Sequence, residues 1–131
     1  MRKCAYTIII WKGNMRDLIR TMRALSDETR LRILSILFKR ECCVCEVMQA
    51  LDISQSRASR NLGILQDASF LKARRDGTWI VYSVDWQAAN RYAASLAELL
   101  KASLVNNELL VQDKERLKQA SRTGPRARRG R

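Results

Sequence analysis

The sequence predicts a mainly α-helical fold with one small β-hairpin. Apolar residues recur at helical spacing through most of residues 15–118. The spacing becomes alternating only in residues 71–84, where Asp76-Gly77 separates two β-prone runs. A length of 131 residues with 47% hydrophobic residues suits one small domain. We therefore expect a domain over residues 15–118, an arm over 1–14 and a basic disordered tail over 119–131.

Two helices are expected at the start of the domain. Leu18, Met22 and Leu25 line one face of a first helix that begins at Met15. Ser26 is placed to cap a second helix, whose acidic first turn suits the positive end of the helix dipole. The second helix is apolar over most of its surface, so we predict that it is the core helix.

A third helix over about residues 44–51 leads into a tight turn at residues 52–54, and Ser54 is placed as the N-cap of a fourth helix that runs to about Asp67. The apolar stripe of the fourth helix consists of Ala58, Leu62 and Leu65. Its other side carries amide, hydroxyl and guanidinium groups, which read base edges and phosphates in DNA. The residues expected to do so are Gln55, Ser56, Arg57, Ser59 and Arg60.

A hairpin follows this helix. Its two strands flank Asp76-Gly77, which favours a type I′ turn with positive φ at both central positions. Arg74, Arg75 and Thr78 lie beside the turn, where basic side chains would meet phosphate or the minor groove. Helix, turn, helix and basic hairpin are contiguous, so the sequence predicts a winged helix-turn-helix.

One long helix is expected from Trp86 to about Lys118, because this stretch contains no Gly or Pro. Its apolar stripe consists of Ala89, Tyr92, Ala93, Leu96, Leu100 and Leu104. Since the earlier helices largely fill the core of so short a domain, we infer that the stripe and the first helix pack against a second copy in a twofold homodimer. Packing within one chain is the alternative.

The two ends of the chain differ from the domain. Residues 1–13 are β-prone without an evident partner strand, so they form either an ordered arm or a segment that precedes a natural start at Met15, which we favour. The last residues are charge-dense and low in apolar content. Their arginines add non-specific phosphate contacts or are simply solvated; they are Arg126, Arg128, Arg129 and Arg131.

Composition narrows the class of function. The formal net charge of +12 favours a polyanionic partner, with nucleic acid as the default. No apolar run approaches eighteen residues, so no membrane span is expected. Histidine is absent, which excludes Ser-His-Asp and Cys-His catalysis and histidine-ligated zinc. These features argue against an enzyme.

Three of the four cysteines, Cys42, Cys43 and Cys45, lie within four positions. A disulfide framework would spread them along the chain, so we expect reduced thiols and a cytoplasmic protein. Soft thiolates suit As(III) and Sb(III), which take three, and Cd(II) and Pb(II), which take up to four. On an intact helix Cys43 lies about 100° from Cys42 and about 200° from Cys45, so convergence requires the helix start to unwind. A helix N-terminus should also lower the thiol pKa.

Four segments resemble the ArsR/SmtB family of metal- and metalloid-responsive winged-helix repressors. Residues 24–34 (ALSDETRLRIL), 54–62 (SQSRASRNL) and 76–82 (DGTWIVY) are similar to the family's LADETRLRIL, SQPKISRHL and GKWVHY segments, with Asn61 in place of the usual His and Gly63 inside the helix. Residues 41–47 (ECCVCEV) resemble the ELCVCDL box of its arsenic- and cadmium/lead-sensing branches. The resemblance implies that Cys43 and Cys45 bind the inducer, with Cys4 of the partner protomer as a possible further ligand.

The resemblance implies a homodimeric repressor of the arsenic-sensing branch, which leaves a roughly palindromic operator when As(III) or Sb(III) binds the cysteines. Without histidine, the zinc- and nickel-sensing branches are disfavoured. Cd(II), Pb(II) and oxidants are the alternative inducers. An architectural DNA-binding protein that ignores thiol ligands is the alternative from another class. A thiol-based enzyme is a third reading, but no general base accompanies the cysteines.

Overall fold

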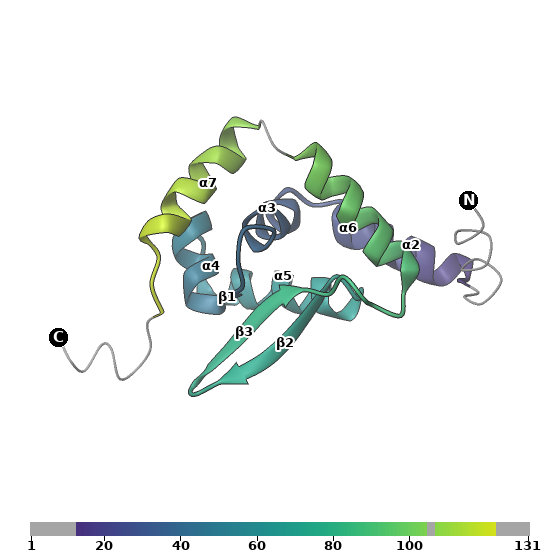
Figure 1. Ribbon diagram of the computed structural model, residues 1–131, viewed down its shortest axis with the longest axis horizontal. Helices are drawn as coiled ribbons and strands as arrows, with labels where there is room; N and C mark the ends of the chain where they lie inside the picture. The colour runs from purple at the N-terminus through teal and green to yellow at the C-terminus, as the bar shows by residue number, and fades with distance from the viewer. Residues whose placement is uncertain (1–12, 105–106, 123–131) are drawn as a thin grey trace.

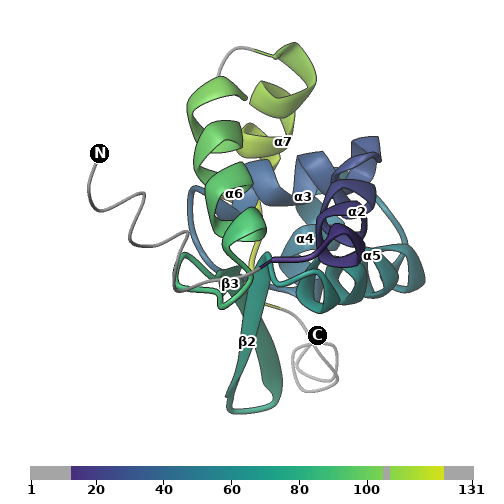
Figure 2. The ribbon, with the colours of Figure 1, turned by 90° about the vertical axis from the view of Figure 1, so that its right-hand side faces the viewer.

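The computed structural model describes residues 13–104 and 107–122. Its elements are α2 (Met15–Leu25), α3 (Glu28–Leu37), β1 (Cys42–Cys43), α4 (Val44–Leu51), α5 (Gln55–Asp67), β2 (Leu71–Asp76), β3 (Trp79–Val84), α6 (Arg91–Ser103) and α7 (Glu108–Gln119). The predicted winged helix-turn-helix is confirmed, with α4 and α5 as the helix pair and β2–β3 as the wing. Figures 1 and 2 both show this wing projecting beyond the helices.

Helix α3 is the core helix, as predicted. Ile33, Leu34 and Ile36 are completely buried, and Figure 1 shows α3 enclosed by α4 and α7 on one side and by α2 and α6 on the other. Burying such a side chain contributes roughly 1.5–3 kcal/mol. The N-cap of α3 is Asp27 rather than the predicted Ser26, because α2 continues to Leu25 and leaves Ser26 at its own C-terminal end.

The turn between α4 and α5 forms as the sequence predicts. Asp52 ends α4 in the left-handed conformation, with φ of 56°. The Ser54 hydroxyl accepts a hydrogen bond from the Arg57 amide at 3.2 Å and so caps α5. Ala58, Leu62 and Leu65 are completely buried, which confirms the apolar stripe of this helix.

Strand β1 was not predicted from the sequence. It pairs with β3 in an antiparallel register that places Cys42 opposite Tyr82 and Cys43 opposite Val81. The sheet therefore has the order β1-β3-β2, with the wing strand β3 in the middle. A two-residue strand carries no period-2 signal, so only its partner reveals it.

The turn of the wing differs from the prediction. Asp76 pairs with Trp79, so the turn is formed by Gly77 and Thr78, one residue later than expected. Gly77 has φ of 63°, whereas Asp76 and Thr78 are not among the described residues with positive φ. The predicted type I′ turn is therefore wrong, because that turn needs positive φ at both central residues.

The single long helix predicted for the C-terminal part is also wrong. Helix α6 ends at Ser103, and α7 begins at Glu108 after Asn107, whose side chain accepts a hydrogen bond from the Leu109 amide. Helix α7 turns back, as Figure 1 shows, and buries Leu110 and Leu117 in the same chain. An N-capping asparagine satisfies the first free amides of a new helix, which explains the break.

A buried ion pair fastens α7 to the core. Asp113 has no exposed side-chain surface, and both of its carboxylate oxygens accept hydrogen bonds from Arg32 at 2.8 Å. Arg116 donates to the same carboxylate at 2.7 Å. The hydrogen bonds that Arg32 donates to Asp113 raise the pKa of Arg32 above its usual value. The alternative of packing within one chain therefore holds for α7.

Residues next to both predicted domain boundaries, at 14/15 and 118/119, pack with the domain. Asn14, assigned to the arm, caps α2 by accepting a hydrogen bond from the Asp17 amide at 2.7 Å. Residues 119–122, assigned to the tail, end α7 and return to α4, where Gln49 and Ser121 exchange two hydrogen bonds. Residues 1–12, with Cys4, and 123–131, with the tail arginines, lie outside the described residues. Within the described ranges every helix is too short or too polar to cross a bilayer.

Replacing Asp113 by Ala should leave the Arg32 guanidinium without its buried partner. We expect the free energy of unfolding to fall by about 3 kcal/mol, as for other broken buried pairs. Glu115→Ala is the matched control, because its ion pair with Lys118 is largely exposed and should contribute under about 1 kcal/mol. Denaturant titrations at one protein concentration measure both, and equal losses would contradict a structural role for the buried pair.

Candidate DNA-binding surface and thiol site

Helix α5 presents the predicted base-reading residues to solvent. All five are exposed and lie outside its buried stripe; they are Gln55, Ser56, Arg57, Ser59 and Arg60. Arg57 has a second contact, since its Nη2 donates to Thr29 Oγ1 at the start of α3 at 2.7 Å. The exposed surface of α5 is thus held against α3 by one of its own basic side chains.

Asn61, which departs from the family motif, lies on the inner side of α5. It is buried, and its Oδ1 accepts a hydrogen bond from Arg30 Nη1 at 3.0 Å. Arg30 also donates through Nε to the Ala24 carbonyl at 2.6 Å. The pair joins α2, α3 and α5 beneath the exposed side of α5 and keeps Asn61 away from solvent. Sequence reasoning missed Arg30, whose only signal was a charged residue in an otherwise apolar helix.

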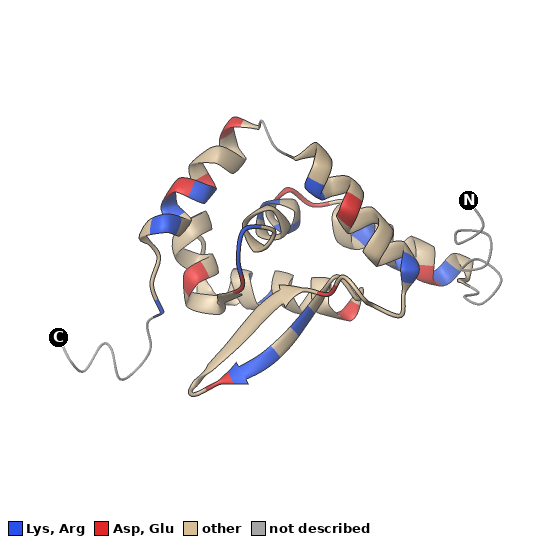
Figure 3. Cartoon of the chain, viewed as in Figure 1, with Lys and Arg blue, Asp and Glu red and all other residues tan. Residues whose placement is uncertain are grey.

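The predicted wing residues Arg74, Arg75 and Thr78 are exposed. Figure 3 shows basic positions along β2 with an acidic position at its end. Arg74 is already paired, because it forms ion pairs with Glu41 and, at 3.8 Å, with Asp76. Arg74 and Arg75 lie on opposite faces of β2, since successive strand residues alternate. Of these two arginines, Arg74 is therefore the one that pairs with Glu41 and Asp76.

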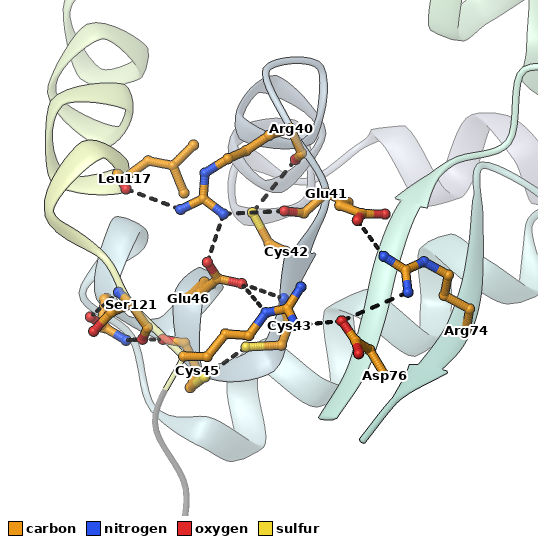
Figure 4. A network of polar contacts seen from close by, with 12 residues as sticks. Arg40, Glu41, Cys42, Cys43, Cys45, Glu46, Arg74, Asp76, Leu117 and Ser121 are labelled. Carbon is orange, nitrogen blue, oxygen red and sulfur yellow. Dashed lines mark hydrogen bonds and ion pairs between the residues drawn. The ribbon is translucent and has the colours of Figure 1, made fainter. Parts of the chain in front are cut away.

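The three clustered cysteines do not share an intact helix, so the argument that their convergence requires a helix to unwind does not apply, whereas the helix predicted over residues 44–51 is confirmed. Cys42 and Cys43 form β1, Cys43 is the N-cap of α4, and only Cys45 is helical. Alternation along the strand sends the two thiols to opposite sides. Cys42 is completely buried in the core, whereas Cys43 Sγ lies 2.7 Å from Cys45 Sγ (Figure 4). Two thiols are therefore together without any unwinding.

Glu46 completes the start of α4. Its Oε1 accepts a hydrogen bond from the Cys43 amide at 3.0 Å, and its Oε2 pairs with Arg40 at 2.6 Å. Burial opposes ionisation of Glu46, but the hydrogen bonds from Cys43 and Arg40 prevail and lower its pKa. An ionised carboxylate near a helix N-terminus also suits the helix dipole. The backbone that carries Cys43 is thus held by a buried charge.

The thiols of Cys42 and Cys43 are protonated at neutral pH. Burial raises the pKa of Cys42 to about 12. Burial, together with the hydrogen bond to Cys45, likewise raises the pKa of Cys43 to about 12. The expectation that the helix N-terminus lowers these pKa values is wrong, because desolvation of a buried thiolate outweighs the dipole. Any thiolate ligation must therefore remove protons from buried sulfur.

Two sulfur atoms, those of Cys43 and Cys45, lie close enough together to bind one soft metal or metalloid ion. Sulfur suits As(III), Sb(III), Cd(II) and Pb(II), and Cys43 and Cys45 supply it from one turn of chain. Within residues 13–104 and 107–122 no three Cys, Asp or Glu side chains are gathered so that they could hold a metal ion. Cys42 would have to leave the core to become a third ligand.

Apolar side chains are exposed on the two helices expected to form a dimer. On α2, Met15 is 70% exposed and Met22 is 53% exposed. On α6, Leu99 is 60% exposed, whereas Ala93 belongs to the core of its own chain. The Asn90 side chain donates to Thr21 Oγ1 at 3.0 Å and holds the start of α6 against α2. The two helices are thus held together by a hydrogen bond, and part of the apolar surface of each is exposed to solvent.

The helix pair α4–α5, its turn and the basic wing define a winged helix-turn-helix DNA-binding protein. The family profile described as "Bacterial regulatory protein, arsR family" matches residues 27–72. The arsenic resistance transcriptional regulator ArsR1 of Pseudomonas putida is 34% identical over 109 residues, which cover 80% of this chain and 83% of that protein. This chain belongs to the ArsR family and is a DNA-binding transcriptional regulator, not an enzyme.

A relative named for resistance to another metal is also similar to this chain. A cadmium resistance regulator, the CadC homolog of Staphylococcus aureus, is 36% identical over 75 residues, covering 56% of this chain and 62% of that protein. Among solved structures, the homodimeric domain of Mb0332 from Mycobacterium bovis aligns with a TM-score of 0.58 and 29% identity, covering 69% of this chain and 80% of that one. HlyU from Vibrio cholerae aligns with a TM-score of 0.59 and 25% identity, covering 70% and 96%.

Proposed function

We propose that this chain is a cytoplasmic, homodimeric repressor of the arsenic-sensing branch, which leaves its operator when As(III) or Sb(III) binds Cys43, Cys45 and a recruited Cys42. The observation that carries the proposal is the 2.7 Å separation of Cys43 Sγ and Cys45 Sγ at the start of α4. Relatives named for arsenic and for cadmium resistance support a soft inducer. Cd(II) and Pb(II) remain the alternative inducers because they also favour sulfur.

The DNA-binding part of the proposal places the exposed side of α5 in the major groove and the wing beside it. Arginine there can be bidentate to guanine, and glutamine to adenine. Arg75 and Thr78 of the wing lie toward the backbone, where basic contacts are salt-dependent and independent of sequence. A twofold dimer would read half-sites about 34 Å apart, or a multiple of this spacing.

The dimer is proposed to form through α2 and α6. The exposed Met15, Met22 and Leu99 side chains would be covered in such an interface, and the similar Mycobacterium bovis domain is homodimeric. Helix α7 packs on α3 and α4 of its own chain, so it would contribute less than the sequence alone implied.

Recruitment of Cys42 would couple the thiols to DNA through β1. Because Cys42 faces the core, β1 must separate from the wing strand β3 before the thiol can turn toward Cys43. Three thiol protons would leave with the three hydroxyls of arsenious acid as water, with no change of oxidation state. The rearranged start of α4 then favours a state with lower operator affinity. This path replaces the unwinding of a continuous helix.

Replacing Cys43 and Cys45 by Ser should leave operator affinity intact and abolish release by arsenite. Cys42→Ser should raise the arsenite concentration needed for release, because a three-sulfur site would lose one ligand. Mobility-shift titrations with a labelled operator measure both quantities, and denaturation curves check that each variant is folded. Release of the Cys43/Cys45 variant at the wild-type arsenite concentration would remove these residues as ligands.

The pH dependence of binding should separate the two classes of inducer. Both Cys42 and Cys43 have a pKa of about 12 and are protonated at pH 6–8. Cd(II) must displace a proton from each protonated thiol, so its affinity should rise about tenfold per pH unit for each proton released. Arsenious acid releases water instead, so its affinity should change little. Calorimetric titrations in buffers of different ionisation enthalpy count the protons, and a steep rise for arsenite would contradict the condensation.

Arg60→Ala should weaken operator binding by at least about fivefold, the lower end expected for a lost bidentate contact to a base. Arsenite binding by the free protein should not change. Lys118→Ala is the matched control, because it removes the same charge from the last turn of α7. Fluorescence anisotropy with operator and with scrambled DNA measures the effect. Undiminished operator affinity of Arg60→Ala would exclude Arg60 from the DNA-reading set.

A further inference from the structure

The chain beyond α7 reaches both the wing and the thiol segment through Arg122. Arg122 Nη1 donates to Asp76 Oδ2 at 2.6 Å, at the tip of β2. The guanidinium carbon lies 5.8 Å from the centroid of the Trp79 ring. Arg122 Nε also lies 3.7 Å from Glu46 Oε1. One side chain therefore contacts both strands of the wing and the first turn of α4.

These contacts belong to a row of alternating charges, which we name the wing clamp: Glu41, Arg74, Asp76, Arg122 and Glu46. Both ends of the wing clamp are attached to the thiol segment. Glu41 directly precedes Cys42 in the chain, and Glu46 accepts the hydrogen bond from the Cys43 amide. Figure 4 shows Glu41 beside Cys42 and Glu46 beside Cys43, with Arg74 and Asp76 on the wing.

The two acidic partners of Arg122 differ in how deeply they are buried. The Glu46 side chain is only 6% exposed and is held by Arg40 and by the Cys43 amide. The Asp76 side chain is 46% exposed, at the wing tip. An exposed ion pair such as Arg122–Asp76 contributes little by itself. The contact of Arg122 with the buried Glu46 is therefore the one that can fix the position of the wing tip. The two hydrogen bonds between Ser121 and Gln49 of α4 fix the backbone one residue before Arg122.

We propose that Arg122 is a positioning residue, which holds the wing tip in place when the thiols are free and releases it when they are ligated. This inference rests on the proposed function, in which Cys43 and Cys45 bind the inducer. Ligation of Cys43 and Cys45 would displace the first turn of α4, which carries Glu46, so that Glu46 moves away from Arg122 and Arg122 loses its buried partner. The wing tip is freed, and operator affinity falls.

The test compares the full chain with Arg122→Gln, Arg122→Lys and the control Lys118→Gln. Lys118 is a neighbouring basic residue that forms an ion pair with the exposed Glu115. For each protein, the operator dissociation constant is measured with and without saturating arsenite. Arg122→Gln should reduce the ratio of the two constants by about 2- to 30-fold, whereas Arg122→Lys should restore most of it and Lys118→Gln should leave it unchanged.

A second readout follows the wing directly. In a background with Trp11→Phe and Trp86→Phe, Trp79 is the remaining tryptophan. Phenylarsine oxide serves as the probe, because it exchanges its oxygen for two thiols and releases one water without a redox change. Its addition should shift the Trp79 emission in this background and in Lys118→Gln, and the shift should be lost in Arg122→Gln and regained in Arg122→Lys.

The outcomes distinguish this inference from the proposed function. Release of wild type with an unchanged ratio in Arg122→Gln would overturn the role of Arg122 and leave the proposed function standing. Failure of wild type to respond to arsenite would overturn the proposed function. The Trp79 signal with phenylarsine oxide would then still decide whether Arg122 links the thiols to the wing, and an equal shift in wild type and Arg122→Gln would overturn that link.

Discussion

The pairing of β1 with β3 is the constraint on which the thiol site and its relation to DNA depend. Two residues of extended chain suffice to send Cys42 into the core and Cys43 toward Cys45. The same pairing places Cys43 at the N-cap of α4, the helix whose other end leads into the turn before α5. The cysteine segment and the wing therefore share one strand, because β3 pairs with both β1 and β2.

Burial gives the cluster its chemical character. A thiol surrounded by apolar side chains cannot ionise cheaply, so Cys42 and Cys43 are neutral where a helix dipole alone would favour thiolates. The fixed negative charge at the site is the Glu46 carboxylate, which is stabilised by the Cys43 amide and Arg40. A neutral inducer that condenses with thiols suits this environment better than a cation that must first displace protons.

The C-terminal helix changes how the domain is held together. Because Asp113 is buried between Arg32 and Arg116, α7 supports α4 from the side opposite the wing (Figure 1). The chain then returns to the wing through Arg122. The segment that carries Cys42, Cys43 and Cys45 is consequently held by β3, by α7 and by the wing clamp. A structural change at these cysteines could therefore reach α5 and the wing by several routes.

The sequence by itself determined the helices whose signals are local. The cap at Ser54 and the spacing of Ala58, Leu62 and Leu65 define α5 wherever the rest of the chain lies. The strand at Cys42 and the inward turn of Asn61 were decided only by tertiary structure. A two-residue strand has no periodicity, and a buried side chain has no partner until distant segments meet. The orientation of each sulfur therefore depends on contacts that local patterns do not contain.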